Sequence, residues 1–107
     1  MDNLAEIIQL VREAASKRIL FLPHAIRQMS RPERMITTAD IRSIIFKGEV
    51  IEDYPEDARG HSCLMLGFDS SDRPIHIVCS PKDEYLAIIT AYLPDEDEWS
   101  DDLRMRM

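Results

Sequence analysis

The chain has 107 residues, a hydrophobic content of 45% and a formal net charge of −7, which fits one domain with a single modest core. The acidic balance argues against a protein that coats nucleic acid without selectivity. No apolar run approaches the roughly 18 residues of a membrane span, and the first residues lack the basic and apolar pattern of a signal peptide. The cytoplasm is therefore the expected location, with no membrane partner.

Residues 4–17 are predicted to form an amphipathic helix. Asn3 and Glu6 have the spacing of a capping box, and the apolar residues behind them recur at helical intervals. The apolar run at 19–22 fits either a strand or the packed end of a connection. The run at 19–22 therefore leaves open whether the chain has one additional strand.

Two further helices are expected before residue 49. Pro23 suits the first turn of a short helix over about 23–30, which ends before Pro32. Thr37 and Asp40 form a second capping box, and Gly48 has the position of a C-terminal cap. The helix between them is the most strongly marked element of the chain.

The second half of the chain has the pattern of a β-meander. Segments rich in β-branched and apolar residues alternate with short loops, which predicts antiparallel hairpins. These segments are 49–54, 61–68, 74–80 and 85–92. Helices followed by strands indicate an α+β fold, with the N-terminal helices on one face of an antiparallel sheet of four strands, or five with residues 19–22. Residues 1–93 form this single domain, and 94–107 form an acidic tail around Trp99, either solvated or docked on the basic segment.

Charge is divided unevenly along the chain, and the basic part surrounds a histidine. Residues 18–47 carry six basic and two acidic residues, a net charge of +4, whereas 48–107 carry five basic and fifteen acidic residues. His24 lies among Arg27, Arg31 and Arg34 in the basic part. Converging guanidinium groups favour a phosphate, and a histidine titrates close to neutral pH. The alternative is that His24 is a helix-start residue and that each arginine pairs with a surface carboxylate.

Three candidates come from the predicted strands. Strict alternation places His76 on the face opposite Ile75, Ile77 and Cys79, which is the open side of the sheet if those three face the helices. Thr90 and Tyr92 share a face at the end of the last strand, where a hydroxyl can reach a phosphate. The alternative for Tyr92 is that it is a half-buried β residue.

A zinc site is not expected. His61, Cys63, His76 and Cys79 lie on neighbouring strands, but the spacing does not pre-organise four ligands. Cys63 and Cys79 are expected to be reduced, buried thiols. No metal or other cofactor is therefore predicted.

Several short motifs occur in an order that resembles the sequence pattern of a small prokaryotic family known mainly as a domain of unknown function. They are His24-Ala25-x-x-x-Met29, Arg34-x-Ile36-Thr37, Asp40-Ile41, Gly48-x-Val50-Ile51, Pro74-x-His76-x-Val78 and Thr90-x-Tyr92. The likeness covers about residues 20–93. That family in turn resembles the RelE-like and BrnT-like toxins of type II toxin–antitoxin systems, and its members are often encoded beside a small zinc-finger antitoxin.

The resemblance implies a RelE-like fold and a metal-independent endoribonuclease. In such enzymes a base activates a ribose 2′-hydroxyl, which attacks the adjacent phosphate. Carried onto this chain, His24, His76 and Tyr92 become the catalytic candidates, while Arg27, Arg34 and Thr90 bind the substrate. The implied partners are RNA and an antitoxin, not DNA, and a homodimer is compatible with them. The alternative is a non-catalytic interaction module that binds an acidic protein through the basic segment.

Overall fold

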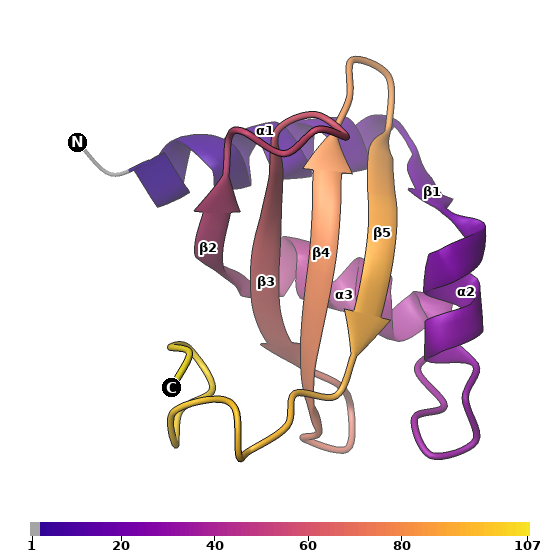
Figure 1. Ribbon diagram of the computed structural model, residues 1–107. Helices are drawn as coiled ribbons and strands as arrows, with labels where there is room; N and C mark the ends of the chain where they lie inside the picture. Colours follow the sequence, from indigo (N-terminus) through magenta and orange to yellow (C-terminus); the bar gives the residue numbers. More distant parts are fainter. Residues whose placement is uncertain (1–2) are drawn as a thin grey trace.

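The computed structural model describes residues 3–107, with side chains from Leu4 onward, and forms three helices and one five-stranded sheet (Figure 1). The capping pair predicted at Asn3 and Glu6 involves a side chain outside the described part. The elements in chain order are α1 (Asn3–Lys17), β1 (Ile19–Phe21), α2 (Pro23–Met29), α3 (Thr38–Lys47), β2 (Glu49–Tyr54), β3 (Ser62–Phe68), β4 (Pro74–Pro81) and β5 (Leu86–Tyr92).

The sheet is mixed, which corrects the prediction of a purely antiparallel one. Its strand order is β1-β5-β4-β3-β2. Strands β2 to β5 form the predicted antiparallel meander, but β1 pairs with β5 in parallel, in the register Ile19↔Leu86 to Phe21↔Ile88. Parallel pairing requires a long crossover. Here the crossover contains α2, α3 and the strands β2 to β4.

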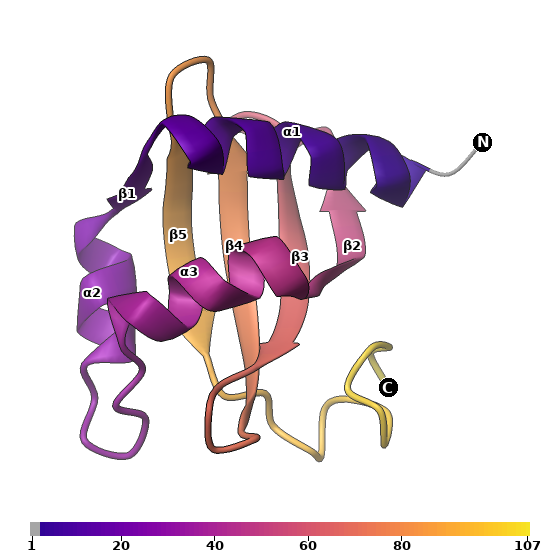
Figure 2. The same cartoon turned by 180° about the vertical axis from the view of Figure 1, so that it is seen from behind.

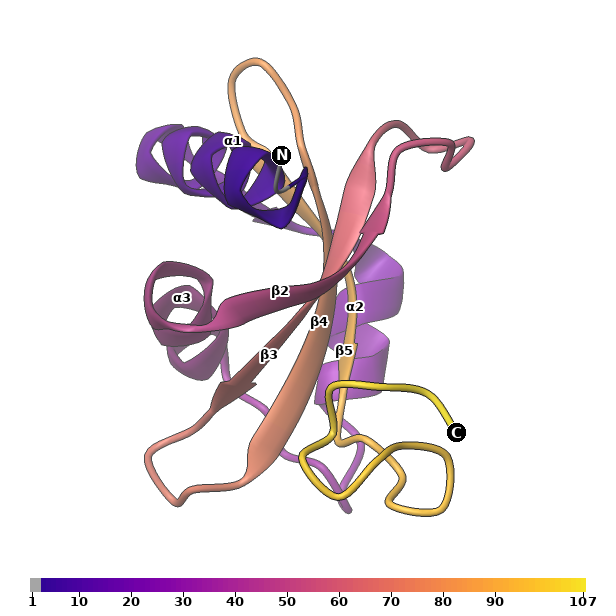
Figure 3. The same ribbon diagram turned by 90° about the vertical axis from the view of Figure 1, so that its left-hand side faces the viewer.

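Two helices, α1 and α3, cover one face of the sheet, as Figures 2 and 3 show. The short helix α2 is not in this layer but packs against β5 at the edge of the sheet, so the expectation of all helices on one face is wrong for α2. None of the helices within residues 3–107 has the length and apolar character that a membrane crossing requires.

Helix α3 begins and ends as its sequence predicts. The Thr37 hydroxyl accepts a hydrogen bond from the Asp40 backbone at 3.1 Å, and the Asp40 carboxylate accepts one from the Thr37 backbone at 3.2 Å. At the other end the Gly48 N–H donates to Ile44 O at 2.6 Å, with φ at −80°. Glycine is required there by space, because a Cβ would lie 2.7 Å from Leu66 O.

The main core lies between these helices and the sheet. Ile7, Val11, Ile41 and Ile45 of the helices are fully buried, and so are the strand residues that face them, Cys63, Met65, Ile75, Ile77, Cys79, Leu86, Ile88 and Ala91. We call the opposite side the open face; it carries Leu64, Leu66 and His76, which alternate with core residues along β3 and β4.

Two β-bulges change which residues reach the open face. On β2 the register steps from Val50↔Met65 to Glu52↔Leu64, so Val50 faces the core while Glu52 and Tyr54 face the open side. On β5 the register steps from Cys79↔Ile88 to Val78↔Thr90, so Ile88 and Ala91 both face the core. A bulge inserts one residue and reverses the alternation beyond it. Strict alternation along β5 would place Leu86 and Ile88 on the same face as Thr90 and Tyr92, and the bulge prevents this.

Gly67 allows α3 to approach β3 closely, which gives a stability prediction. A Cβ at this position would lie 3.0 Å or less from three side-chain carbons of Ile44. We expect Gly67→Ala to lower the free energy of unfolding by about 1–3 kcal/mol, the usual cost of overpacking. Urea denaturation measures this, with the exposed Ser43→Ala as the control. An unchanged midpoint would show that the helix can move away.

Candidate functional site

His24 and Arg27 lie on the exposed surface of α2. Within residues 3–107 neither side chain makes a hydrogen bond or an ion pair. The two residues are therefore accessible to a ligand. Within the described chain no hydrogen bond, ion pair or ring contact joins either of them to the candidates on β4 and β5.

Arg34 is turned back onto α2 instead of projecting into solvent. Its Nη1 donates to Gln28 Oε1 at 2.6 Å and to Gln28 O at 3.3 Å. Arg31 forms an exposed ion pair with Glu33 at 3.9 Å. In the described part of the chain the expectation of a carboxylate partner thus holds for Arg31 and fails for Arg27 and Arg34.

His76 and Tyr92 are brought together on the open face. They are directly paired across β4 and β5, and their rings meet edge to face at 5.5 Å between centroids. Burial lowers the pKa of His76 and raises the pKa of Tyr92. Thr90 lies opposite Val78 on β4 and makes no side-chain hydrogen bond to a described residue.

His76 is fully buried because residues 94–107, which we call the C-terminal strap, fold back over it. Trp99 is 3% exposed and lies edge to face on the imidazole at 4.4 Å. The imidazole Nε2 donates to Leu103 O at 3.0 Å. Figure 3 shows the strap on the side of the sheet away from α1 and α3. The solvated tail that composition favoured is therefore not observed, and the His76 ring is out of reach of a substrate in this conformation.

The strap is attached through its two arginines, not through its carboxylates. Arg104 forms an ion pair with Glu49, and Arg106 Nε lies 3.0 Å from Glu52 Oε2. Both partners lie on β2. The prediction that a docked tail would place its carboxylates on the basic segment is wrong, since the strap contacts the most acidic strand instead.

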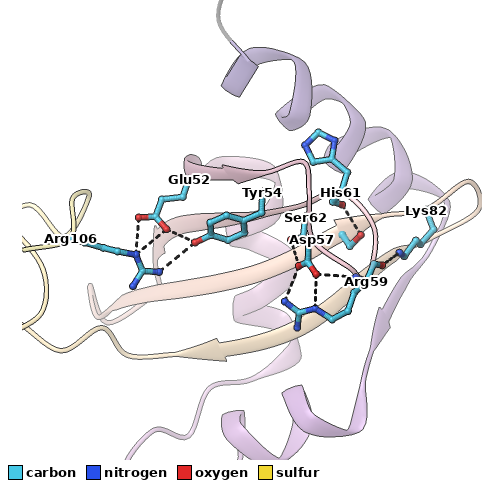
Figure 4. Close-up of polar contacts among 9 residues, drawn as sticks. Glu52, Tyr54, Asp57, Arg59, His61, Ser62, Lys82 and Arg106 are labelled. Atoms are coloured by element: carbon cyan, nitrogen blue, oxygen red, sulfur yellow. Dashed lines mark hydrogen bonds and ion pairs between the residues drawn. The ribbon is translucent and has the colours of Figure 1, made fainter.

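Glu52, Tyr54 and Arg106 form a cluster on the open face that the sequence did not reveal (Figure 4). The Tyr54 hydroxyl donates to Glu52 Oε1, Arg106 Nε contacts both carboxylate oxygens at 3.0 and 3.2 Å, and Arg106 Nη2 donates to the Tyr54 oxygen at 3.4 Å. The Glu52 side chain is 22% exposed and that of Arg106 is 61% exposed. A carboxylate, a phenol and a guanidinium therefore meet at a point that solvent can reach.

Tyr54 and Arg106 of this cluster both keep their protons at neutral pH. Burial, followed by the hydrogen bond to Glu52, raises the pKa of Tyr54 to about 12, so the phenol keeps its proton at neutral pH. The hydrogen bond to Tyr54 raises the pKa of Arg106 further. The set thus holds one acceptor, Glu52, and two protonated donors.

A second group of polar contacts braces the loop between β2 and β3, and Figure 4 shows those of Asp57 with Arg59 and Ser62. The His61 Nε2 and Asp53 Oδ1 atoms are 2.5 Å apart. Asp57 accepts from Arg59 Nη2 at 2.8 Å and from Ser62 Oγ at 2.6 Å. The hydrogen bond from the Arg59 side chain is the largest cause that lowers the pKa of Asp57 well below its usual range. These contacts fix the loop conformation.

Cys63 and Cys79 are buried free thiols, as predicted. Their sulfur atoms are 3.8 Å apart, and the hydrogen bond between them and their burial raise the pKa of Cys79. Within residues 3–107 no three His, Cys, Asp or Glu side chains are grouped closely enough to hold a metal ion.

A surface cavity of about 570 Å³ lies away from these candidates, between the end of α1 and the β4–β5 hairpin. A smaller one of about 370 Å³ adjoins the strap and is lined by Lys47, Glu49, Phe68 and Arg104 among others. Neither cavity is lined by a residue of the Glu52 cluster or by His76 and Tyr92. A ligand that enters either of these two cavities would therefore not touch the cluster or the pair of His76 and Tyr92.

The fold and the site define an α+β domain with a mixed open sheet and a polar cluster on its open face. The chain belongs to the family described as Domain of unknown function (DUF4258), whose sequence model matches residues 21–93. This confirms the expected membership in a family of unknown function. Comparison with curated proteins and with solved structures gave no match. The matched region ends at Leu93, so Trp99 and Arg106 lie beyond it.

Proposed function

We propose that the protein is a metal-independent endoribonuclease of the toxin type, with a RelE-like fold and with Glu52, Tyr54 and Arg106 at its active site. The observation that carries the proposal is the meeting of these three side chains on the open face, within 3.4 Å of one another. The motif resemblance to RelE-like and BrnT-like toxins supports the same activity. An antitoxin of the zinc-finger type is the corresponding partner.

The three groups match the steps of RNA transesterification. The Glu52 carboxylate takes the proton from a ribose 2′-hydroxyl, and the 2′-oxygen forms a bond to phosphorus. The bond from phosphorus to the 5′-oxygen breaks, and the Tyr54 phenol donates its proton to that oxygen. Arg106 binds the phosphoryl oxygens, whose negative charge increases in the transition state. RNA must replace Glu52 on the arginine for this geometry to form.

The sequence candidates take supporting roles in this proposal. His24 and Arg27 are exposed on α2 without a described partner, so they bind the RNA backbone, where phosphate contacts supply most of the affinity. Tyr92 and Thr90 lie on the same face as the cluster and border the RNA path. His76 lies beneath Trp99 and does not touch RNA.

The test is cleavage of single-stranded RNA by the full chain in the presence of a metal chelator. We expect products that end in a 2′,3′-cyclic phosphate and no cleavage of DNA, which lacks the 2′-hydroxyl. Glu52→Gln is expected to lower the cleavage rate by about 10²–10⁴-fold, the usual contribution of a general base.

The matched control is Glu49→Gln, which also removes a carboxylate that β2 offers to an arginine of the strap. It is expected to retain the wild-type rate, because Arg104 is not in the cluster. Intact RNA after incubation with the wild-type protein, or an equal loss in both variants, would contradict the proposal.

A second function, a non-catalytic interaction module, is favoured by the exposed arginines Arg18, Arg27 and Arg42. Within residues 3–107 none of them has a carboxylate partner, and Arg42 only lies over the Phe21 ring at 5.8 Å. Unpaired, exposed arginines suit an acidic protein surface. Binding of such a partner without any RNA cleavage, abolished by Arg27→Glu, would favour this alternative.

A further inference from the structure

The strap forms a small folded unit that carries Arg106 on Trp99. The Arg106 guanidinium lies over the indole ring at 4.7 Å, and the two residues form an isolated β-bridge. The Ser100 N–H donates to Met105 O at 2.8 Å, and the Met107 N–H donates to Glu98 O at 3.0 Å. The place of Arg106 beside Glu52 and Tyr54 therefore depends on where Trp99 sits.

His76 is the surface on which that unit rests. Trp99 packs against the imidazole, and Leu103 O accepts its Nε2 proton. A carbonyl oxygen can only accept, so the neutral ring carries its proton on Nε2. The Nδ1 atom is buried and has no hydrogen-bond partner among the described residues. Protonation would place a second N–H and a positive charge at a point that offers no acceptor.

The charged neighbours do not remove this cost. Glu52 on β2 favours the imidazolium, whereas Arg106 on the strap disfavours it, and the effect of burial exceeds both. Tyr92 on β5 faces the imidazole as a neutral phenol, because burial raises the pKa of Tyr92. The negative charge of Glu98 on the strap also raises the pKa of Tyr92. The docked strap therefore favours the neutral form of His76 over the protonated form.

We propose that His76 is a positioning residue whose neutral imidazole seats the strap and so holds Arg106 at Glu52 and Tyr54, and whose protonation releases the strap in mildly acidic solution. The effect of the strap on RNA cleavage rests on the proposed function, whereas the release of the strap at low pH is independent of it. The protein thus has a pH-sensitive element next to its site, built from residues on both sides of the Leu93 boundary of the family match.

The direction of the pH effect follows from the two states of the strap. When the strap is undocked, His76 is exposed and titrates near its ordinary value of 6.5, whereas burial lowers its pKa when the strap is docked. The undocked state therefore binds more protons in the interval between these values. Docking is strongest above pH 6.5 and weakens as the pH falls toward the lowered pKa.

Trp99 is the only tryptophan of the chain, so its fluorescence reports on the strap alone. We expect the emission of the wild-type protein to shift to longer wavelength between about pH 7.5 and pH 5, with a parallel rise in quenching by acrylamide. Quenching is needed because a nearby imidazolium can dim an indole that has not moved. Far-ultraviolet circular dichroism should stay constant, which shows that the sheet remains folded.

His76→Gln is the diagnostic variant, since its amide can donate to Leu103 O but does not titrate. We expect its emission and quenching to stay flat over the same pH range. The chain has three histidines, so the His24→Gln, His61→Gln double variant keeps His76 alone and should retain the wild-type transition. In that variant the ring proton signals in NMR should titrate with the same midpoint as the quenching, which tests the proposal even if His76→Gln fails to fold.

A wild-type protein whose Trp99 stays protected at pH 5, or a transition that His76→Gln leaves in place, would overturn the inference. The RNA assay separates it from the proposed function. A strap transition without RNA cleavage leaves His76 as the seat of the strap and refutes the endoribonuclease. RNA cleavage that persists at low pH without a strap transition supports the endoribonuclease and refutes the role of His76 in seating the strap.

Discussion

Arg106→Ala is expected to lower the rate of RNA cleavage by about 10²–10³-fold, the usual effect of removing one donor to a developing oxyanion. Arg106 is the cation that contacts both Glu52 and Tyr54, and its side chain is 61% exposed, so a phosphate can reach it. A lysine at this position cannot replace it in full, because only the planar guanidinium offers two parallel donors to a phosphate. Single-turnover kinetics on a short RNA measures the loss.

Arg104→Ala is the matched control for this result. Arg104 lies two residues earlier on the same strap and pairs with Glu49 instead of Glu52. It should change the rate only slightly, since exposed ion pairs contribute little to stability. Arg106→Lys should recover part of the rate through its charge. Equal rates in Arg106→Ala and Arg104→Ala would remove Arg106 from the site.

Trp99→Ala is expected to lower the free energy of unfolding by about 3 kcal/mol, the lower end of the range for a buried aromatic residue. Trp99 is 3% exposed and packs on both His76 and Arg106. The lower end applies because the strap can detach from the sheet, so the protein need not keep an empty cavity.

Urea denaturation monitored by circular dichroism measures this loss. Trp99→Phe is the control, since it keeps an apolar ring against His76 and should cost less. A difference between Trp99→Ala and wild type below about 0.5 kcal/mol would mean that the strap adds nothing to stability. The same variant should also lose RNA cleavage, because Arg106 would no longer be held at Glu52.

Local signals in the sequence predicted most of the fold. The capping box of Thr37 and Asp40 fixed the start of α3, Gly48 fixed its end, and alternation with short loops located the four strands of the meander. These signals act over a few residues, so they can be recognised without knowledge of the tertiary structure. The parallel pairing of β1 with β5 could not be recognised in this way, because it joins segments more than sixty residues apart.

The candidate site was less accessible to such reasoning. Strict alternation places Val50, Glu52 and Tyr54 on one face, and only the bulge between Val50 and Glu52 turns the latter two away from the core. A bulge of this kind has no marked sequence signal here, since no glycine accompanies it. The docking of the strap could not be predicted from its composition, because six acidic residues in 94–107 suggest a solvated segment. The contacts with the sheet are made instead by its two arginines and its single tryptophan.

The bulge on β2 also bears on how the sheet ends. Strand β2 is the last in the order, so one side of its backbone has no neighbouring strand within the described chain. Exposed edges of this kind invite a strand from another molecule, and proteins discourage this with bulges and charged side chains. Here the strand combines a break in register with the carboxylates of Glu49, Glu52 and Asp53. The feature that turns Glu52 toward the open face thus also protects the free edge against aggregation.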